Sequence, residues 1–302
     1  VRTNPNKLNT RQKLTFALDD DVDSFLRDFI TRETPESDRR ISDKAITYID
    51  LLQDKGLISY QVSDYLFFGS ASRNAEMAGI KGAFIGSILT LAVCLSIAFP
   101  IGIASALYLE EFAPKNRLTE IIEININNLA AVPSVVFGIL GLAIFINIFG
   151  MPRSIPLIGG MVLALMTLPT IIISSRAAIR AVPPSIRDGA LGVGASKMQT
   201  TFHHVLPLAL PGILTGTIIG MAQALGETAP LLMIGMVAFI VDIPGSITDP
   251  GTVLPVQIFM WADFAERMFI QKTSSAILVL LAFLVIMNSF AVWLRKKLER
   301  RW

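Results

Sequence analysis

The chain has 302 residues, 52% of them hydrophobic, and its mean hydropathy is too high for one soluble domain of this length. The formal net charge of +2 is nearly neutral, and nothing in the charge pattern indicates a nucleic-acid partner. The single cysteine, Cys94, excludes both an internal disulfide and a metal site built from cysteines. The composition therefore predicts a membrane protein.

The first 78 residues are mostly polar, and we expect an N-terminal extension (1–78) before a membrane domain (79–302). Within the extension, apolar residues recur at helical spacing over 22–30, behind the acidic run Asp19–Asp21, and again over 41–52, behind Ser42. Gly56 follows as a C-terminal stop. Because this apolar surface is too small for a large core, we predict a small helical cap resting on the membrane domain or on a partner.

Five stretches of the membrane domain are apolar enough to cross a bilayer, which takes ~20 residues. The uncharged stretches are 83–109, 124–152, 154–175, 198–226 and 273–294. The fourth continues past Glu227 to Val241, which predicts one acidic residue inside an otherwise apolar helix. Pro100 predicts a kink in the first span, and Pro169 frees a backbone carbonyl in the middle of the third. We therefore predict an all-α polytopic membrane protein with five transmembrane helices.

Several polar residues lie within or at the ends of the predicted spans and indicate either a path for a substrate or an interface with a neighbouring subunit. The candidates are Thr167, Arg176, Gln223, Glu227 and Thr228. An ionised carboxylate there costs at least ~2.5–3.5 kcal/mol on insertion scales, so Glu227 needs a partner, water or a proton. Two interpretations stay open. Glu227 borders the substrate path, or it pairs with an arginine of a neighbouring subunit or with Arg176.

Lysine and arginine are concentrated on one side of the predicted spans, and this asymmetry sets the orientation. One side collects only Arg153, Arg267 and Lys272. The other collects Lys115, Arg117, Arg176, Arg180, Arg187, Lys197, Arg295, Lys296, Lys297, Arg300 and Arg301. We therefore expect the loop 177–211 and the C-terminus in the cytoplasm and the N-terminal segment outside. That arrangement implies a sixth, N-terminal helix missing from this chain; the alternative is an inverted topology with a cytoplasmic N-terminus.

The loop between the third and fourth spans is polar and basic, and it predicts a short structured element outside the bilayer. Pro183–Pro184 ends the preceding helix, Ser185 can cap a new one, and Asp188 suits its first turn. Gly192 and Gly194 end or loosen that helix. A second short helix carrying Phe202 and Val205 is then predicted to break at Pro207 and Pro211.

The chemistry of an enzyme is missing from the sequence. The chain lacks the G-x-x-x-x-G-K-[ST] pattern that would hold ATP phosphates. His203 and His204 are adjacent, and adjacent residues do not share one helix face for a metal. No nucleophile–base pair has a supporting context. We predict a protein with no catalytic site and no metal site.

The pattern Asp188-Gly189-Ala190, three residues, Gly194, and later Leu206-Pro207 resembles the "EAA" loop of ABC importer permeases, with Asp188, Gly189 and His204 replacing consensus Glu, Ala and Ile. Further stretches resemble the phosphate-specific permeases of the PstA type. They are GIKGAFIGSILTL (79–91), YLEEFAPKNR (108–117), NNLAAVPSVVFGILGL (127–142), MTLPTIIISSRAAIRAVPPSIRDGALGVGASK (166–197) and GETAPLLMIG (226–235). Together they cover most of residues 79–240.

The resemblance implies a MetI-like ABC permease fold that carries inorganic phosphate across the cytoplasmic (inner) membrane. It implies a second permease of the PstC type, two ATPases of the PstB type that bind ATP and Mg²⁺, and an external phosphate-binding protein of the PstS type. It also implies a short helix that docks on the ATPase, in a coupling loop whose residues are Ser185, Asp188, Gly189, Ala190, Gly194, Ala195, Ser196, Leu206 and Pro207. The alternatives are a sulfate or molybdate importer, a stand-alone secondary transporter, and a scaffold that recruits an ATPase.

Overall fold

The structure, a computed structural model, describes residues 16–59, 64–237 and 239–298, and within these ranges the regular elements are all helical. Arg300 and Arg301 of the predicted basic tail, and the start of the extension, lie outside them. The α-helices are α1 (Asp20–Leu26), α2 (Asp43–Asp54), α3 (Asp64–Phe68), α4 (Lys81–Leu107), α5 (Arg117–Ala130), α6 (Ser134–Gly141), α7 (Pro156–Arg180), α8 (Pro184–Gly192), α9 (Lys197–Gln199), α10 (Leu206–Gly226), α11 (Ala229–Met233), α12 (Leu254–Ala262) and α13 (Arg267–Leu298). Three π-helical turns extend them: η4 (Tyr108–Phe112), η5 (Leu142–Ile148) and η6 (Thr200–Val205). Two 3₁₀ turns complete the set, η2 (Glu36–Asp38) and η3 (Ala75–Met77).

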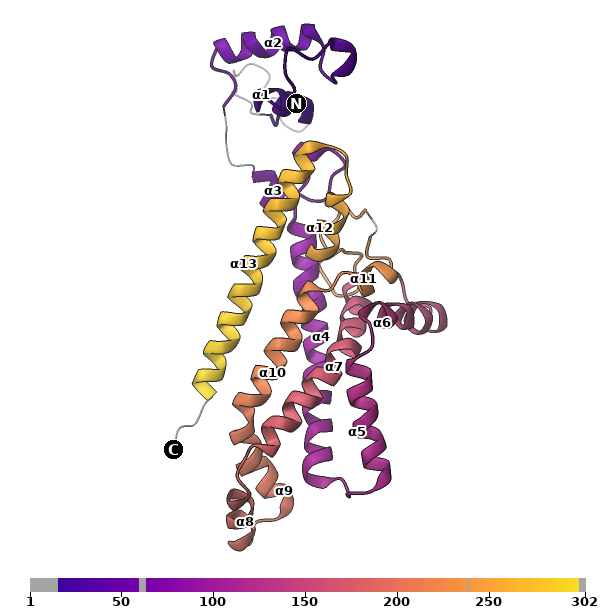
Figure 1. Cartoon of the computed structure of the whole chain (residues 1–302), viewed down its shortest axis with the longest axis vertical. Coiled ribbons are helices and arrows are strands. Elements are labelled where there is room, and N and C mark those ends of the chain that lie inside the picture. Colours follow the sequence, from indigo (N-terminus) through magenta and orange to yellow (C-terminus); the bar gives the residue numbers. More distant parts are fainter. Residues whose placement is uncertain (1–15, 60–63, 238, 299–302) are drawn as a thin grey trace, which may run out of the picture.

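Four continuous helices are long and apolar enough to cross a membrane: Lys81–Phe112, Pro156–Arg180, Lys197–Gly226 and Arg267–Lys297. The predicted second span is instead a bent pair, Arg117–Ala130 and Ser134–Ile148, whose axes meet at 101°. In Figure 1, α5 runs along the bundle and α6 lies across it. Pro133 stands at the bend, where its ring cannot continue a helix from α5. The structure thus confirms an all-helical membrane fold with four spans, or five if the bent pair counts as one.

Helices α4, α7 and α10 form the centre of the bundle because small residues let their backbones approach closely. A Cβ atom added to Gly160 would lie 2.5 Å from the Cβ of Val93, and one added to Gly216 would lie 1.9 Å from the Oγ of Ser174. Along α4 the fully buried positions Cys94 and Ala98 belong to the same seam. Close backbone approach replaces large side chains as the source of packing between membrane helices.

Two predictions about prolines and Glu227 are wrong. The fourth span does not break at Pro207 or Pro211: the chain is helical from Lys197 to Gly226, with Pro207 in the first turn of α10, where a missing N–H costs no bond. Glu227 does not lie inside a helix, because α10 ends at Gly226 and Glu227 takes an extended conformation. A new short helix, α11, starts two residues later and has Pro230 in its first turn.

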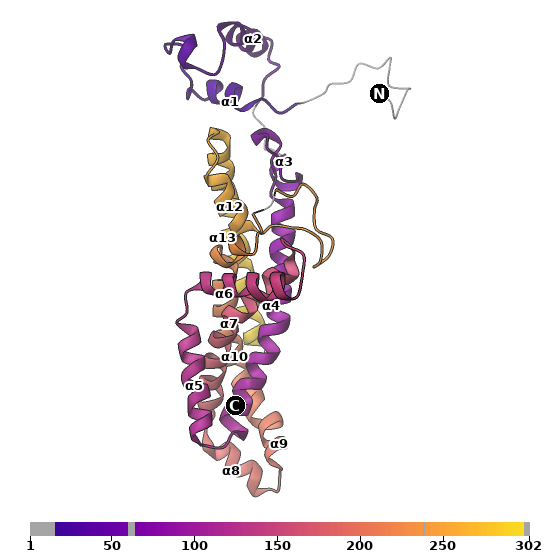
Figure 2. The same ribbon diagram turned by 90° about the vertical axis from the view of Figure 1, so that its right-hand side faces the viewer.

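Helices α1 and α2 of the extension lie at the far end of the bundle from α8 and α9, and α3 connects them to α4 (Figures 1 and 2). Helix α2 begins at its predicted cap, Ser42, and Gly56 follows it with φ of +61°. A small apolar cluster joins α1 and α2, and its buried members are Phe25, Ile41, Ile46 and Ile49. The predicted first helix is shorter than its apolar pattern: it ends at Leu26, before Asp28 with φ of +60°.

The extension contacts α13 at more than one point: Lys272 of α13 donates hydrogen bonds to the backbone carbonyls of Glu76 and Ala78, and Asp20 contacts the start of the helix. The Oδ1 atom of Asp20 accepts a hydrogen bond from the backbone N–H of Met268 at 2.8 Å. This N–H lies in the first turn of α13, where it has no partner within the helix. The guanidinium of Arg267 also lies over the ring of Phe29, 5.2 Å from its centroid. Asp20 therefore caps a helix 248 residues away.

The segment between α11 and α13 folds back on the bundle. Trp261 and Leu254 of α12 are buried, in a cluster with Phe269 of α13. In the loop before α12, the Asp249 carboxylate accepts hydrogen bonds from the backbone of Gly245 and Ser246 at 3.0 and 2.9 Å. Hydrogen bonding by Ser246 and then by Gly245 holds the pKa of Asp249 below its usual value.

Candidate functional site

The part of the predicted loop 177–211 that projects from one end of the bundle is α8 and α9 (Figure 1), whereas residues 177–180 belong to α7 and residues 206–211 to α10. Helix α8 ends in a Schellman motif: Ala195 N–H donates to the carbonyl of Ala190 at 3.1 Å, and Gly194 N–H donates to that of Leu191 at 2.9 Å. Gly194, at the C′ position, has φ of +91°. This is left-handed backbone, which glycine adopts without strain. The predicted stop at Gly194 is confirmed, and its physical reason is this turn.

The start of α8 differs from the prediction. Pro183 is its N-cap and makes no side-chain cap bond, so Ser185 does not cap the helix. Asp188 lies beyond the first turn, where the helix dipole acts on it only weakly. Pro184 occupies the first helical position because its fixed φ suits a helix start and its missing N–H is not needed there.

The side chains at the tip of this elbow, α8 and α9 with the turn between them, are exposed. Val193 is 85% exposed, Met198 59% and Leu191 50%, three apolar residues that nothing in the described chain covers. Ser185, Asp188 and Gly189 are exposed as well, whereas Ala190 faces inward and is buried. The elbow thus presents an apolar surface with polar neighbours to its surroundings.

The second half of the loop is held by a capping box. Ser196 accepts a hydrogen bond from the N–H of Gln199, whose side chain accepts one from the N–H of Ser196, at 3.2 and 2.9 Å. Ala195 is half-buried between the two short helices. Leu206 and Pro207 lie in the first turn of α10, beyond the π-helical turn η6. The two parts of the pattern therefore occupy different helices: Asp188-Gly189-Ala190 lies in α8 and Leu206-Pro207 in α10. The π-helical turn η6, which leads into α10, contacts α8.

A set of charged residues behind the elbow was missed at the sequence level. Arg187 of α8 donates to Glu111 Oε1 from Nη2 and Nε at 2.7 and 3.0 Å. It also donates to the carbonyls of Val182 and Ile179, at 2.7 and 2.9 Å, at the C-terminal end of α7. The Glu111 side chain is only 9% exposed. One arginine therefore joins α8 to the end of α7 and to the turn η4.

Arg176 is the centre of a second set in the same region. Its Nε donates to Glu110 Oε1 and its Nη2 to Glu123 Oε1, both at 2.7 Å. Arg180, whose side chain is 69% exposed, shares Glu110 at 2.8 Å. Because Arg176 pairs with these two carboxylates, the predicted pairing of Glu227 with Arg176 is wrong. Two signals in the sequence could have pointed to the set. Arg176 and Arg180 have the i, i+4 spacing that puts them on one helix face, and Glu110 and Glu111 are adjacent at the end of another apolar span.

The remaining intramembrane candidates are not gathered in one place. Thr167 is buried in α7, donates to the carbonyl of Leu163 at 3.0 Å, and contacts Cys94 of α4. Gln223 is exposed on α10, and Glu227 and Thr228 are half-buried at the break between α10 and α11. Glu227 makes no ion pair with any residue in the described ranges. No group of three metal-binding side chains occurs among those residues either.

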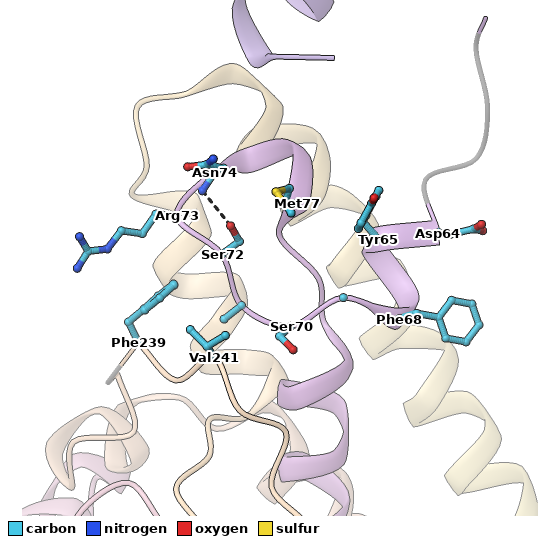
Figure 3. Close-up of a pocket in the computed structure, with 12 residues that line it drawn as sticks. Asp64, Tyr65, Phe68, Ser70, Ser72, Arg73, Asn74, Met77, Phe239 and Val241 are labelled. Carbon is cyan, nitrogen blue, oxygen red and sulfur yellow. Dashed lines mark hydrogen bonds between the residues drawn. The ribbon is translucent and has the colours of Figure 1, made fainter. Parts of the chain in front are cut away.

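A cavity lies at the other end of the molecule (Figure 3). It encloses about 730 Å³ between α3, the loop that follows it and the segment around Phe239. The Arg73 guanidinium lies 5.6 Å from the centre of the Phe239 ring, and Asn74 N–H donates to Ser72 Oγ at 3.1 Å. None of the predicted site residues lines this cavity.

The fold and the projecting elbow define a multi-spanning membrane component of a transport system. A family model described as "Binding-protein-dependent transport system inner membrane component" matches residues 98–302. The chain belongs to this family. Its members are membrane subunits, in agreement with the predicted class of protein.

Several curated proteins are similar to this chain. A probable ABC transporter permease of Bacillus subtilis, YqgI, is 32% identical over 185 residues, which cover 59% of this chain and 62% of that protein. The phosphate transport system permease protein PstC of Haemophilus influenzae is 31% identical over 234 residues, covering 70% and 73%. The phosphate transport system permease protein PstA 1 of Mycobacterium tuberculosis is 30% identical over 156 residues, covering 52% and 50%. The match thus spans less than two thirds of YqgI and of PstA 1.

Two solved structures show the same fold. One is an inward-facing MetNI methionine ABC transporter, with a TM-score of 0.61 and 15% identity, covering 73% of this chain and 96% of that chain. The other is a bacterial ABC transporter involved in the import of the acidic polysaccharide alginate, with a TM-score of 0.56 and 16% identity, covering 84% and 90%. The predicted ABC importer permease fold is confirmed.

Proposed function

We propose that this chain is a permease subunit of an ATP-driven importer and that its cargo is inorganic phosphate. The observation that supports the mechanism is the elbow: it ends α8 in a hydrogen-bonded turn and carries the exposed side chains of Leu191 and Val193 outward from one end of the bundle. The cargo is supported by similarity to a phosphate permease over 70% of the chain. Sulfate or molybdate carried by the same mechanism is a possible outcome of the experiment below.

In this proposal the elbow docks on a cytoplasmic ATPase. The chain contributes no nucleotide site, and ATP and Mg²⁺ bind to two ATPase subunits of the PstB type. A second permease of the PstC type completes the membrane path, and a phosphate-binding protein of the PstS type delivers the cargo from outside. Binding of ATP would draw the ATPases together, move the docked elbows, and shift the permeases between two open states.

The orientation follows from the docking. The α8 end faces the cytoplasm of a multi-pass inner-membrane protein, and the extension (1–78) lies outside. The ends of α7 and α13 and the loop between α4 and α5 supply the cationic residues that favour this side. Gln223, Glu227 and Thr228 then lie on the side open to the second permease, whereas Thr167 and Arg176 serve the packing of this chain.

The experiment is reconstitution of the complete complex in vesicles, with uptake of labelled phosphate compared with labelled sulfate. Uptake of phosphate alone supports the assignment, and equal uptake of both refutes the phosphate cargo. A Leu191→Ala, Val193→Ala double variant should weaken ATPase binding by about tenfold, because it removes apolar surface that would be buried on docking. Val241→Ala, equally apolar and 53% exposed at the opposite end, is the matched control and should leave binding unchanged.

A further inference from the structure

The turn η4, at the end of the α4 helix, receives contacts from both arms of the elbow. Arg187 of α8 bonds Glu111, and the ammonium of Lys197 in α9 lies 5.6 Å from the centre of the Phe112 ring. These residues are next to each other on one turn of π-helix, a rare geometry that often marks functional positions. The elbow therefore rests on η4 as well as being continuous with α7.

The two contacts differ in strength. Arg187 makes four hydrogen bonds at 2.7–3.0 Å and fixes its guanidinium plane between two helices. The contact of Lys197 with Phe112 is a single cation–π approach and permits sliding. Between the arms, a Cβ added to Gly194 would meet no atom within 4 Å, so that face of the turn is open. The α8 arm is held on η4 by hydrogen bonds, whereas the α9 arm begins the continuous helix Lys197–Gly226 and contacts η4 through the single cation–π approach.

Glu110, the neighbour of Glu111, extends the clamp into the membrane helices. Its carboxylate bonds Arg176 of α7, which in turn bonds Glu123 of α5 at 2.7 Å. Adjacent residues on a helix point in different directions, so this turn can hold α8 with one glutamate and α7 with the next. A displacement of α8 would thus reach α4, α7 and α5 through two carboxylates.

We propose that η4 is the joint that transmits movement of the elbow to the membrane helices, with Glu111 and Arg187 as positioning residues that keep α8 and α4 moving as one body. This inference rests on the proposed function for the origin of the movement. Nucleotide-driven displacement then enters through the clamped arm, while the turn at Gly194 and the π-helical turn η6 absorb the change on the α10 side.

The first test measures the coupling ratio, the number of phosphate ions imported per ATP hydrolysed, in vesicles holding the complete complex. Glu111→Ala should lower this ratio by about tenfold, with ATP hydrolysis and the amount of assembled complex retained. Glu111→Gln keeps an oxygen acceptor without the charge, so its coupling ratio should lie between those of the parent complex and Glu111→Ala. Arg180→Gln is the matched control, because Arg180 is exposed and Glu110 keeps Arg176 without it. Loss of assembly and of both activities in equal measure for Glu111→Ala and Glu111→Gln would overturn the proposal.

The second test is a double-variant cycle. If Glu111 and Arg187 act as one unit, Glu111→Ala combined with Arg187→Ala should lower the ratio no further than the more harmful single change. If the two single changes lower the coupling ratio by factors that multiply in the double variant, the residues act independently, and the proposal that they form one joint is refuted.

A distance measurement tests the joint separately from the cargo. Spin labels at Tyr108 and Pro184, both exposed, report the separation of η4 and α8, and labels at Pro184 and Ile219 report that of α8 and α10. The first distance should be the same in nucleotide-free and ATP-bound complexes, and it should change between these states in Glu111→Ala. A parent complex whose first distance changes on ATP binding would contradict the proposal. Transport of sulfate in place of phosphate would remove the proposed cargo and leave this result intact.

Discussion

Replacing Gly194 with alanine tests whether the end of α8 has the conformation described above. The residue has φ of +91°, and an L-amino acid in left-handed backbone costs roughly 1–2 kcal/mol. No atom lies within 4 Å of the added Cβ, so the cost comes from the backbone alone and not from a clash. Because 1.4 kcal/mol is a factor of ten, opening of the Schellman turn should become roughly 5- to 30-fold more frequent.

Hydrogen exchange of the peptide spanning 189–199, measured in the assembled complex, reports this opening directly. The amides of residues 194 and 195 donate the two bonds of the turn and should lose protection in Gly194→Ala. Gly189→Ala is the matched control. It also places a methyl group in open space, but inside the helix α8, where alanine is favoured by roughly 0.5–1 kcal/mol. Its exchange should slow. Equal behaviour of the two variants would refute the argument from backbone conformation.

Three further predictions concern other parts of the chain. Gly160→Leu should prevent α4 and α7 from packing, because even its Cβ would lie 2.5 Å from that of Val93, and the variant should lose assembled complex on size-exclusion chromatography. Asp20→Ala removes the acceptor for the N–H of Met268 and should increase proteolysis of the extension, at a cost of about 1 kcal/mol; unchanged proteolysis would count against the cap. The lowered pKa of Asp249 implies that its loop is stabilised above the ordinary carboxyl pKa and loosens as the pH falls through the lowered value, and Asp249→Asn should abolish that dependence in hydrogen exchange.

The spans could be predicted from sequence because a helix that crosses a bilayer must be long, apolar and internally hydrogen-bonded. Two helix boundaries were predicted wrongly. Pro211 was interpreted as a break, yet the membrane environment favours continued helix around it. Glu227 was placed inside a helix because the apolar stretch continues beyond it, whereas α10 ends at Gly226 and a separate helix, α11, follows.

The candidate site could be predicted only in part. Gly194 was found because its role is local: a left-handed residue that ends a helix leaves a mark in the sequence. The pairs of Arg176 with Glu110 and of Arg187 with Glu111 join residues 66 and 76 positions apart. Their pairing depends on how α4 and α7 cross, and no short pattern encodes that crossing.

The hydrogen bond between Asp20 and Met268 has a consequence for biosynthesis. Asp20 is synthesised early and the start of α13 late, so the hydrogen bond that caps α13 cannot form until Met268 has left the ribosome. Until then the small apolar cluster around Phe25 must hold its two helices together unaided. Nascent chains arrested before α13 should therefore carry an N-terminal unit that is folded but unattached, and its attachment would signal that the last helix has been inserted.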